Sequence, residues 1–257
     1  MTRTPAMQRH TSAHALDRDR VDVWLLALSD DVLAQTESFA AILSDDERHR
    51  AARFVRDRDR ARFVIGRAGL RLLLGDYLGM DARSLTFAVE PHGKPMLSST
   101  AASVDIQFNL AHSEALIAWA VGCERAVGID VEHIPRLHSL STCPSAFLSP
   151  SEEQLLAAMA DTDRVARMAE YWTLKEACVK AAGTGLTADV TQLTFDIGPG
   201  SACRLTESVA DAARWEFRLV RPREDYVLAI CADRSDRPLD LQSLEFIPTD
   251  WRKKSTV

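Results

Sequence analysis

The five residues Gly128 to Glu132 (GIDVE) alternate apolar and acidic side chains, a pattern that constrains both fold and chemistry. In a strand, successive side chains point to opposite faces, so Asp130 and Glu132 share one face. With a rise of about 3.3 Å per residue, their carboxylates lie roughly 7 Å apart. A divalent cation would relieve their repulsion, and oxygen ligands of this kind suit Mg²⁺. The segment therefore predicts a strand with a metal-binding face, although solvent-facing strands also carry alternating acids.

A helical segment about forty residues later adds a second group of polar side chains. Trp172, Glu176 and Lys180 are spaced i, i+4 and i+8, so all three project from one stripe of the helix. One interpretation is a surface Glu–Lys pair worth a few tenths of a kcal/mol. The other is a third metal carboxylate with an ammonium group beside it that neutralises phosphate charge.

The remaining periodicity predicts two lobes of similar organisation. Each half of the chain contains helices and several strands in a similar order, so the expected fold class is α+β, with two pseudo-symmetric α/β lobes, each a small sheet packed with helices. We expect a tail at 1–20, a first lobe at 21–124 and a second at 125–257, meeting near 121–127. Predicted strands are 21–28, 85–90, 106–110, 116–121, 128–132, 193–197, 215–220 and 226–231; predicted helices are 57–74, 151–159 and 164–182, with another beginning at the Ser44 capping box.

The charge distribution excludes some classes of function. A net charge of -6 and a pI near 5.7 argue against a general nucleic-acid binder, which would carry a basic domain. Between Glu47 and Arg71, however, nine arginines stand against three acids. This window could bind phosphates or an acidic protein surface, or it could be a solvated helix face with paired charges.

Targeting and cysteine patterns point to the cytoplasm. The first twenty residues contain no apolar run long enough for a signal peptide or a membrane helix, so we expect a mobile tail and no membrane association. The five cysteines are scattered and include no CxxC pair. This distribution favours free buried thiols in a reducing compartment over a disulfide framework or a zinc site.

Four motifs together resemble a known family. The strings GIDVEHI (128–134) and WTLKEACVKAAGTGL (172–186) resemble the paired signature of 4'-phosphopantetheinyl transferases of the surfactin-synthetase-activating type. Upstream, HGKP (92–95) and FNLAHS (108–113) are similar to two further family segments. Two ordered motifs at the expected separation are far more specific than either alone. The resemblance spans roughly residues 43–186 and implies the two-lobed fold of that family, usually as a monomer.

The resemblance also implies roles for individual residues. It implies a first lobe that binds coenzyme A, and a second lobe that holds Mg²⁺ and contacts the carrier protein. The residues that match family positions are Asp130, Glu132 and Glu176 as magnesium ligands; Arg50, Arg62, Lys94, Pro95, His112 and Lys180 as coenzyme A contacts; and Glu152, Glu176 and Lys180 as catalytic groups, with Glu152 or Glu176 accepting the serine proton. Two positions depart from the family pattern: Ala111 replaces a frequent serine, and Glu47 a frequent lysine.

The implied reaction transfers 4'-phosphopantetheine from coenzyme A to a serine hydroxyl of an acyl or peptidyl carrier protein and releases adenosine 3',5'-bisphosphate. The carrier could belong to fatty acid, polyketide or nonribosomal peptide synthesis. Two alternatives remain open. One is a Mg²⁺-dependent phosphohydrolase that uses the same acids, and the other is a non-catalytic module that docks a carrier protein through its arginines.

Overall fold

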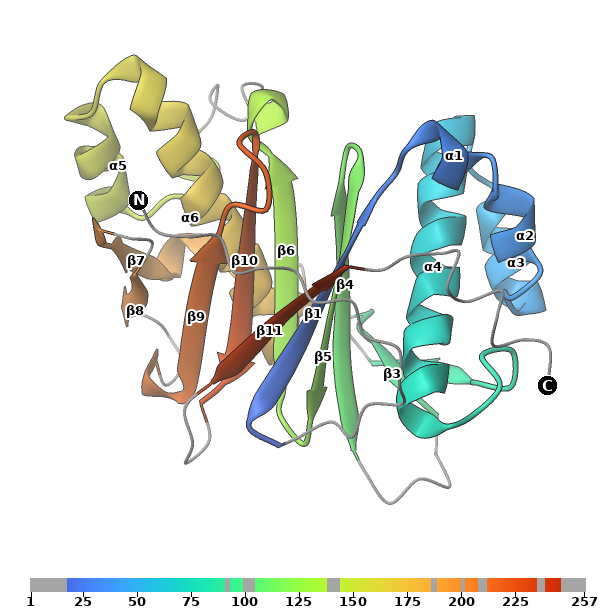
Figure 1. Ribbon diagram of the computed structural model, residues 1–257. Coiled ribbons are helices and arrows are strands. Elements are labelled where there is room, and N and C mark those ends of the chain that lie inside the picture. Colours follow the sequence, from blue (N-terminus) through green and yellow to red (C-terminus); the bar gives the residue numbers. More distant parts are fainter. Residues whose placement is uncertain are drawn as a thin grey trace.

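The fold is built on two main sheets, each covered by one long helix (Figure 1). The structure, a computed structural model, describes residues 18–90, 93–98, 105–137, 144–185, 189–199, 202–207, 212–234 and 239–245. Helix α4 (Asp57–Leu78) covers one sheet and helix α6 (Asp161–Ala182) covers the other. The α+β class and the two-lobed arrangement expected from the sequence are confirmed.

The first lobe is built on a four-stranded sheet with the order β11-β1-β5-β4. Its strands are β1 (Arg20–Ala27), β4 (Ile106–Ser113), β5 (Leu116–Cys123) and β11 (Asp240–Glu245). Strand β1 pairs antiparallel with β5 and parallel with β11. The same lobe contains α1 (Asp30–Leu33), α2 (Thr36–Ala40), α3 (Asp45–Ala51) and the hairpin of β2 (Phe87–Val89) with β3 (Pro95–Leu97).

The second lobe is built on a three-stranded sheet with the order β6-β10-β9. Its strands are β6 (Val127–His133), β9 (Trp215–Val220) and β10 (Tyr226–Asp233), and a separate hairpin joins β7 (Thr194–Ile197) to β8 (Cys203–Glu207). Helix α5 (Pro150–Ala157) precedes α6, and short 3₁₀ turns lie at Pro144–Ala146, Val190–Gln192 and Ala212–Arg214, among others. Helix α6 ends at Gly183, whose φ of 68° is the left-handed conformation of a glycine cap.

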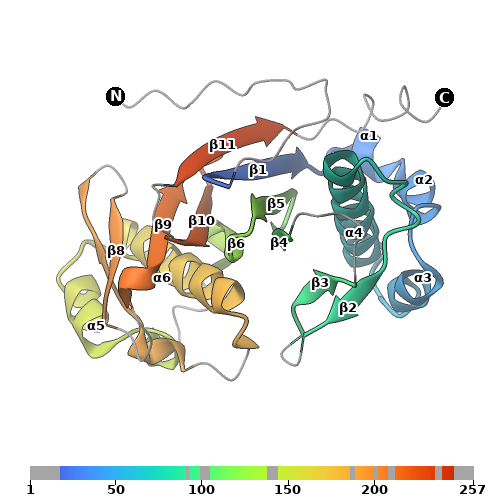
Figure 2. The ribbon, with the colours of Figure 1, turned by 90° about the horizontal axis from the view of Figure 1, so that it is seen from below.

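The two lobes meet where β4 lies beside β6 (Figure 2). A shared apolar core fills this seam, with side chains from both sheets that include Val23, Ala111 and Ala118 on one side and Ile129, Val131 and Leu228 on the other. Asn109 of β4 adds a polar link, because its Oδ1 accepts a hydrogen bond of 3.0 Å from the backbone N–H of Ile129. The lobes are therefore joined through side chains of β4 rather than through a flexible linker alone.

The end of the chain departs from the expected lobe boundary. The boundary assigned every residue after 124 to the second lobe, yet β11 pairs with β1 in the first sheet, with Arg20 opposite Asp240. Residue 20 was expected in a mobile tail, but it begins β1, and residues 1–17 lie outside the described part. No described helix is both long and apolar enough to cross a membrane. Cys123, Cys178, Cys203 and Cys231 form no disulfide among the described residues, and Cys143 lies outside them.

Candidate active site

Helix α6 lies directly against β6 because Gly128 has no side chain. A Cβ atom at this position would lie 2.1 Å from the carbonyl oxygen of Ala177 and 2.4 Å from the backbone nitrogen of Ala181. Both distances are too short for any side chain, so the glycine permits the contact. The close approach brings the stripe of Trp172, Glu176 and Lys180 to the acidic face of β6. Strand and helix thus meet as the two sequence patterns predicted.

Asp130 and Lys180 form the central ion pair of this site. Lys180 Nζ lies 2.6 Å from Asp130 Oδ1, whereas Asp130 Oδ2 is buried and has no hydrogen-bond partner among the described residues. Burial raises the pKa of Asp130 to about 7; Lys180 opposes this shift, and Glu132 and Glu176 add to it. Burial would lower the pKa of Lys180, but Asp130, Glu176 and Glu132 outweigh it and raise that pKa. Negative charge from the neighbouring acids therefore exceeds positive charge around both groups.

Glu132 is held by two neutral donors. Ser113 Oγ donates to Glu132 Oε2 at 2.7 Å, and Trp172 Nε1 donates to Glu132 Oε1 at 3.3 Å. Neither donor cancels the charge of the carboxylate, so both fix its orientation while leaving it anionic.

The acidic side chains of this site are of the kind that binds a hard divalent cation. The electrostatic coupling places Asp130, Glu132 and Glu176 near one another with Lys180. The unpartnered oxygen of Asp130 is available as a ligand. Carboxylate oxygens are the donors that Mg²⁺ prefers. Among the residues that the structure describes, however, no three His, Cys, Asp or Glu side chains already converge on one ion position. The magnesium ligand set therefore stays a prediction.

A group of basic side chains lies next to the acids. His112 lies three residues after Asn109 on β4; the residue retains surface exposed to solvent, but its imidazole is partly desolvated and lies among cationic groups. Loss of solvation lowers the pKa of His112, and the positive charges of Arg62, Lys180 and Arg136 lower it further. Arg62 is held in place on α4, because its Nε donates to the carbonyl oxygen of Glu114 at 3.1 Å. Such a concentration of positive charge beside an imidazole suits a phosphate group.

Lys94 connects the first lobe to the second. Its Nζ lies 3.2 Å from the carbonyl oxygen of Val127 and 3.5 Å from that of Ala181, near the C-terminal end of α6. Burial lowers the pKa of Lys94, an effect that Glu90 opposes. Pro95 begins β3 next to it. Arg50 is an exposed residue of α3, and its guanidinium lies 5.3 Å from the centre of the Phe63 ring. Their predicted contacts with coenzyme A remain untested.

Glu152 does not lie where a catalytic base is needed. Its side chain is completely buried, and its Oε2 lies 2.6 Å from Lys175 Nζ. The same oxygen accepts a hydrogen bond from the backbone N–H of Ser149 at the start of α5, and Oε1 accepts one from that of Phe195. Both oxygens are engaged in joining α5 to α6 and β7. A buried carboxylate in these contacts cannot reach a serine hydroxyl on another protein, so this position contradicts the predicted catalytic role.

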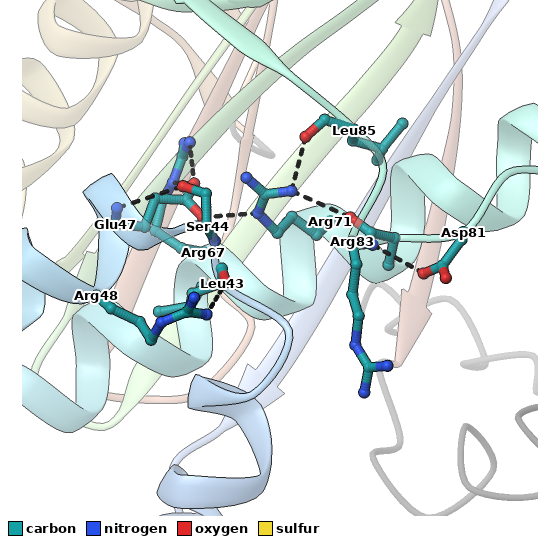
Figure 3. Close-up of polar contacts among 10 residues, drawn as sticks. Leu43, Ser44, Glu47, Arg48, Arg67, Arg71, Asp81, Arg83 and Leu85 are labelled. Atoms are coloured by element: carbon teal, nitrogen blue, oxygen red, sulfur yellow. Dashed lines mark hydrogen bonds and ion pairs between the residues drawn. The ribbon is translucent and has the colours of Figure 1, made fainter.

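Glu47 also has a structural role, as the centre of an ion-pair cluster between α3 and α4 (Figure 3). Its carboxylate lies 2.6 Å from both Arg67 and Arg71, and it completes the capping box with Ser44 at the start of α3. Burial would raise the pKa of Glu47, but the two guanidinium groups outweigh it and hold that pKa below its ordinary value. A lysine here would place three cations together. The glutamate thus accounts for part of the arginine-rich window, where Arg67 and Arg71 join α3 to α4 instead of binding a ligand.

Sequence reasoning missed Ser113 and the orienting role of Trp172. The alternation of β4 was a usable signal for Ser113, because it places Asn109, Ala111 and Ser113 on the face opposite His112. Ala111, the other departure from the family pattern, is buried in the seam between the lobes. Its methyl group packs between the sheets, so the position is an apolar contact in this chain.

Comparisons with known proteins find similar chains along most of the sequence. Residues 32–124 match a family model described as the N-terminal part of 4'-phosphopantetheinyl transferase, and residues 126–231 match one described as the 4'-phosphopantetheinyl transferase superfamily. The 4'-phosphopantetheinyl transferase HetI of Nostoc sp. is 34% identical over 82% of this chain and 87% of its own. The transferase Sfp of Bacillus subtilis is 22% identical over 82% of this chain and 92% of its own.

Among solved structures, the chain is similar to a holo-(acyl-carrier-protein) synthase from Bacillus anthracis in complex with CoA (3',5'-ADP). The two are 18% identical with a TM-score of 0.36, over 42% of this chain and 94% of the synthase.

Proposed function

Because the chain belongs to the 4'-phosphopantetheinyl transferase superfamily and is an enzyme of that class, we propose that it acts on coenzyme A and a carrier protein as the surfactin-synthetase-activating type does. It would transfer 4'-phosphopantetheine to a serine hydroxyl. The observation that carries this proposal is the adjacency of two opposite charge clusters at the lobe seam. The acids of β6 and α6 lie on one side, and the basic groups around His112 lie on the other.

The acids would hold Mg²⁺ through Asp130, Glu132 and Glu176. When bound, the ion supplies Lewis-acid stabilisation of the negative charge that develops on the diphosphate. The support is the unpartnered buried oxygen of Asp130 and the surplus negative charge that both Asp130 and Lys180 sense.

The basic groups would bind the nucleotide end of coenzyme A. His112 and Arg62 offer donors to a phosphate, with Arg50 nearer the edge of the first lobe. Lys94 lies beside the C-terminal end of α6 and Lys180 is in the last turn of that helix, and the two ammonium groups would bind the diphosphate. Fixed cations aimed at the leaving phosphate stabilise its charge without reorganisation.

Glu176 is the carboxylate we assign to the proton of the incoming serine. It shares a stripe of α6 with Lys180 and is only partly buried, unlike Glu152. In the reaction, the serine Oγ bonds to the phosphorus that carries the pantetheine arm, and the hydroxyl proton passes to Glu176 directly or through a water. The bond to the adenylate phosphate breaks, and adenosine 3',5'-bisphosphate leaves.

We assign the nucleotide contacts mainly to the first lobe, and the metal and carrier contacts to the second. Lys94 and Ser113 of the first lobe nevertheless reach into the second, so the site requires both. One chain contains all the assigned groups, which supports a monomer as the active form.

The test is incubation with coenzyme A, Mg²⁺ and a panel of apo carrier proteins, followed by intact-mass measurement of each carrier. A mass gain equal to phosphopantetheine on one carrier is expected. Asp130→Asn should slow this gain at least about a hundredfold, because it removes an anionic ligand of the Mg²⁺ that would stabilise the charge developing on the diphosphate. The matched control is Asp196→Asn, an exposed acid of β7, which should retain the activity. Consumption of coenzyme A without a mass gain on any carrier would indicate hydrolysis and overturn the proposal.

A further inference from the structure

Ser113 lies at the point where the first lobe touches the acidic site of the second. It is the last residue of β4 and has 0% exposed surface. Its Oγ donates to Glu132 Oε2 at 2.7 Å and accepts a hydrogen bond of 3.1 Å from the backbone N–H of His133. A hydroxyl has one proton to donate. The backbone contact fixes the oxygen, and the single proton is directed to the carboxylate.

The position of Ser113 follows from the alternation of β4. Asn109, Ala111 and Ser113 face β6 and are buried, whereas His112 points to the opposite face and is exposed. Asn109 and Ser113 both bond to β6, at Ile129 and at Glu132. One strand thus places a phosphate-binding imidazole on one face and a carboxylate-orienting hydroxyl on the other, one residue apart.

The second oxygen of Glu132 is also fixed. Trp172 Nε1 of α6 donates to Oε1, so donors from β4 of the first lobe and α6 of the second determine the orientation of this carboxylate. Asp130, by contrast, is paired with a cation, Lys180. Neutral donors orient a metal ligand and leave its charge for the metal, and losing such a donor typically weakens metal binding by about 10–100-fold.

We propose that Ser113 is a positioning residue through which the first lobe completes the divalent-cation site of the second. Its hydroxyl sets the orientation of Glu132, and the cation site is therefore formed only when β4 and β6 are docked. This inference rests on the proposed function, because it assumes that Glu132 is a ligand of a divalent cation.

The test measures metal affinity, separately from activity. Mn²⁺ is titrated into coenzyme A-saturated protein, and the free ion is followed by electron paramagnetic resonance, with a coenzyme A-only titration subtracted. Ser113→Ala is expected to raise the dissociation constant for Mn²⁺ by about tenfold or more. The affinity of Ser113→Ala for coenzyme A, measured with a chelator present to remove metal ions, should remain within about twofold of the wild-type value, since no phosphate contact is removed.

Two further variants separate positioning from loss of structure. Asn109→Ala removes the other side-chain bond between β4 and β6 but touches no acid, so it should lower the melting temperature while leaving the Mn²⁺ dissociation constant unchanged. Ser113→Thr keeps the hydroxyl and should restore Mn²⁺ binding to within about threefold of wild type.

Each remaining outcome overturns the inference. It fails if Ser113→Ala binds Mn²⁺ as wild type does, if Asn109→Ala weakens binding equally, or if the alanine and threonine variants behave alike; the transferase proposal survives all three. Absence of Mn²⁺ binding by the wild-type protein would overturn the proposed metal role together with this inference.

Discussion

Buried charges at the residue scale serve two different purposes in this protein. Glu152 and Lys175 are both completely buried, and each has several partners; Lys175 also donates to the carbonyl oxygens of Phe147 and Val190. Asp130 is also buried, but it retains an oxygen without a hydrogen-bond partner among the described residues. Completed pairs of the first kind hold elements together, whereas an incomplete one such as Asp130 is open to a ligand.

Replacing Glu152 should therefore affect stability and not chemistry. In Glu152→Gln the buried ammonium of Lys175 loses its counter-charge, so the free energy of unfolding should fall by about 3–5 kcal/mol. Urea denaturation measures this loss, and turnover is compared per folded molecule. Glu153→Gln, at the adjacent and partly exposed position, should cost less than about 1 kcal/mol. A folded Glu152→Gln protein with strongly reduced turnover would restore Glu152 to the catalytic set.

At the scale of elements, glycines set the distance between helix and sheet in both lobes. Gly128 admits the backbone of α6 to β6, as described above. In the first lobe Gly69 of α4 faces Trp119 of β5, where a Cβ would lie 2.5 Å from the indole ring. The indole is a side chain and could shift slightly, whereas the obstacle at Gly128 is backbone. The contact at Gly128 is thus the less tolerant of the two. It is also the contact that determines the position of Glu176 and Lys180.

Gly128→Ala should accordingly weaken both folding and catalysis. The added methyl group must push α6 away from β6, which should cost about 1–3 kcal/mol or more of stability and separate the helix stripe from the acids. Thermal melting and the Mn²⁺ titration measure the two effects. Gly198→Ala is the matched control, because its nearest obstacle is 3.8 Å away. Equal melting temperatures for the two variants would show that the β6–α6 contact can relax.

Local sequence signals predicted the long helices and most strands, but they did not predict the short elements α1, α2, β3 and β8 or the distant partners of buried groups. Periodicity, the Ser44 capping box and the Gly183 cap located α3, α4, β6 and α6 to within a few residues. The burial of Glu152 depends on Lys175 in another helix, and no local pattern shows which buried cation a glutamate meets. Strand β11 was missed because its six residues alternate only weakly and its partner is at the start of the chain. The approach of Trp172 and Lys180 to the acids of β6 could be predicted because the strand and helix periods each fix a face.

At the scale of the whole molecule, the two described ends of the chain share one sheet. Strand β11 covers the outer edge of β1 in parallel, and β5 covers the other edge (Figure 2). Without β11, the backbone groups along one side of β1 would be exposed at a sheet edge, which favours association with other chains.

Truncation tests this contribution. A chain ending at residue 239 lacks β11, whereas a chain ending at residue 245 keeps it. Both truncations lack residues 246–257, so they differ only in β11. Loss of several backbone hydrogen bonds, at about 0.5–1.5 kcal/mol each, should cost roughly 3 kcal/mol and lower the melting temperature by roughly 6–12 °C relative to the longer truncation. Differential scanning calorimetry of both proteins provides the comparison. Identical melting temperatures would mean that β11 adds nothing to the first sheet.

The pairing of Arg20 with Asp240 also governs the order in which the protein can mature during translation. A ribosome synthesises β1 long before β11, so the first sheet remains with one edge of β1 unpaired until the whole second lobe between the two strands has been made. Nascent chains stalled before residue 240 should consequently depend on chaperones, even though every other strand of that sheet has already been made.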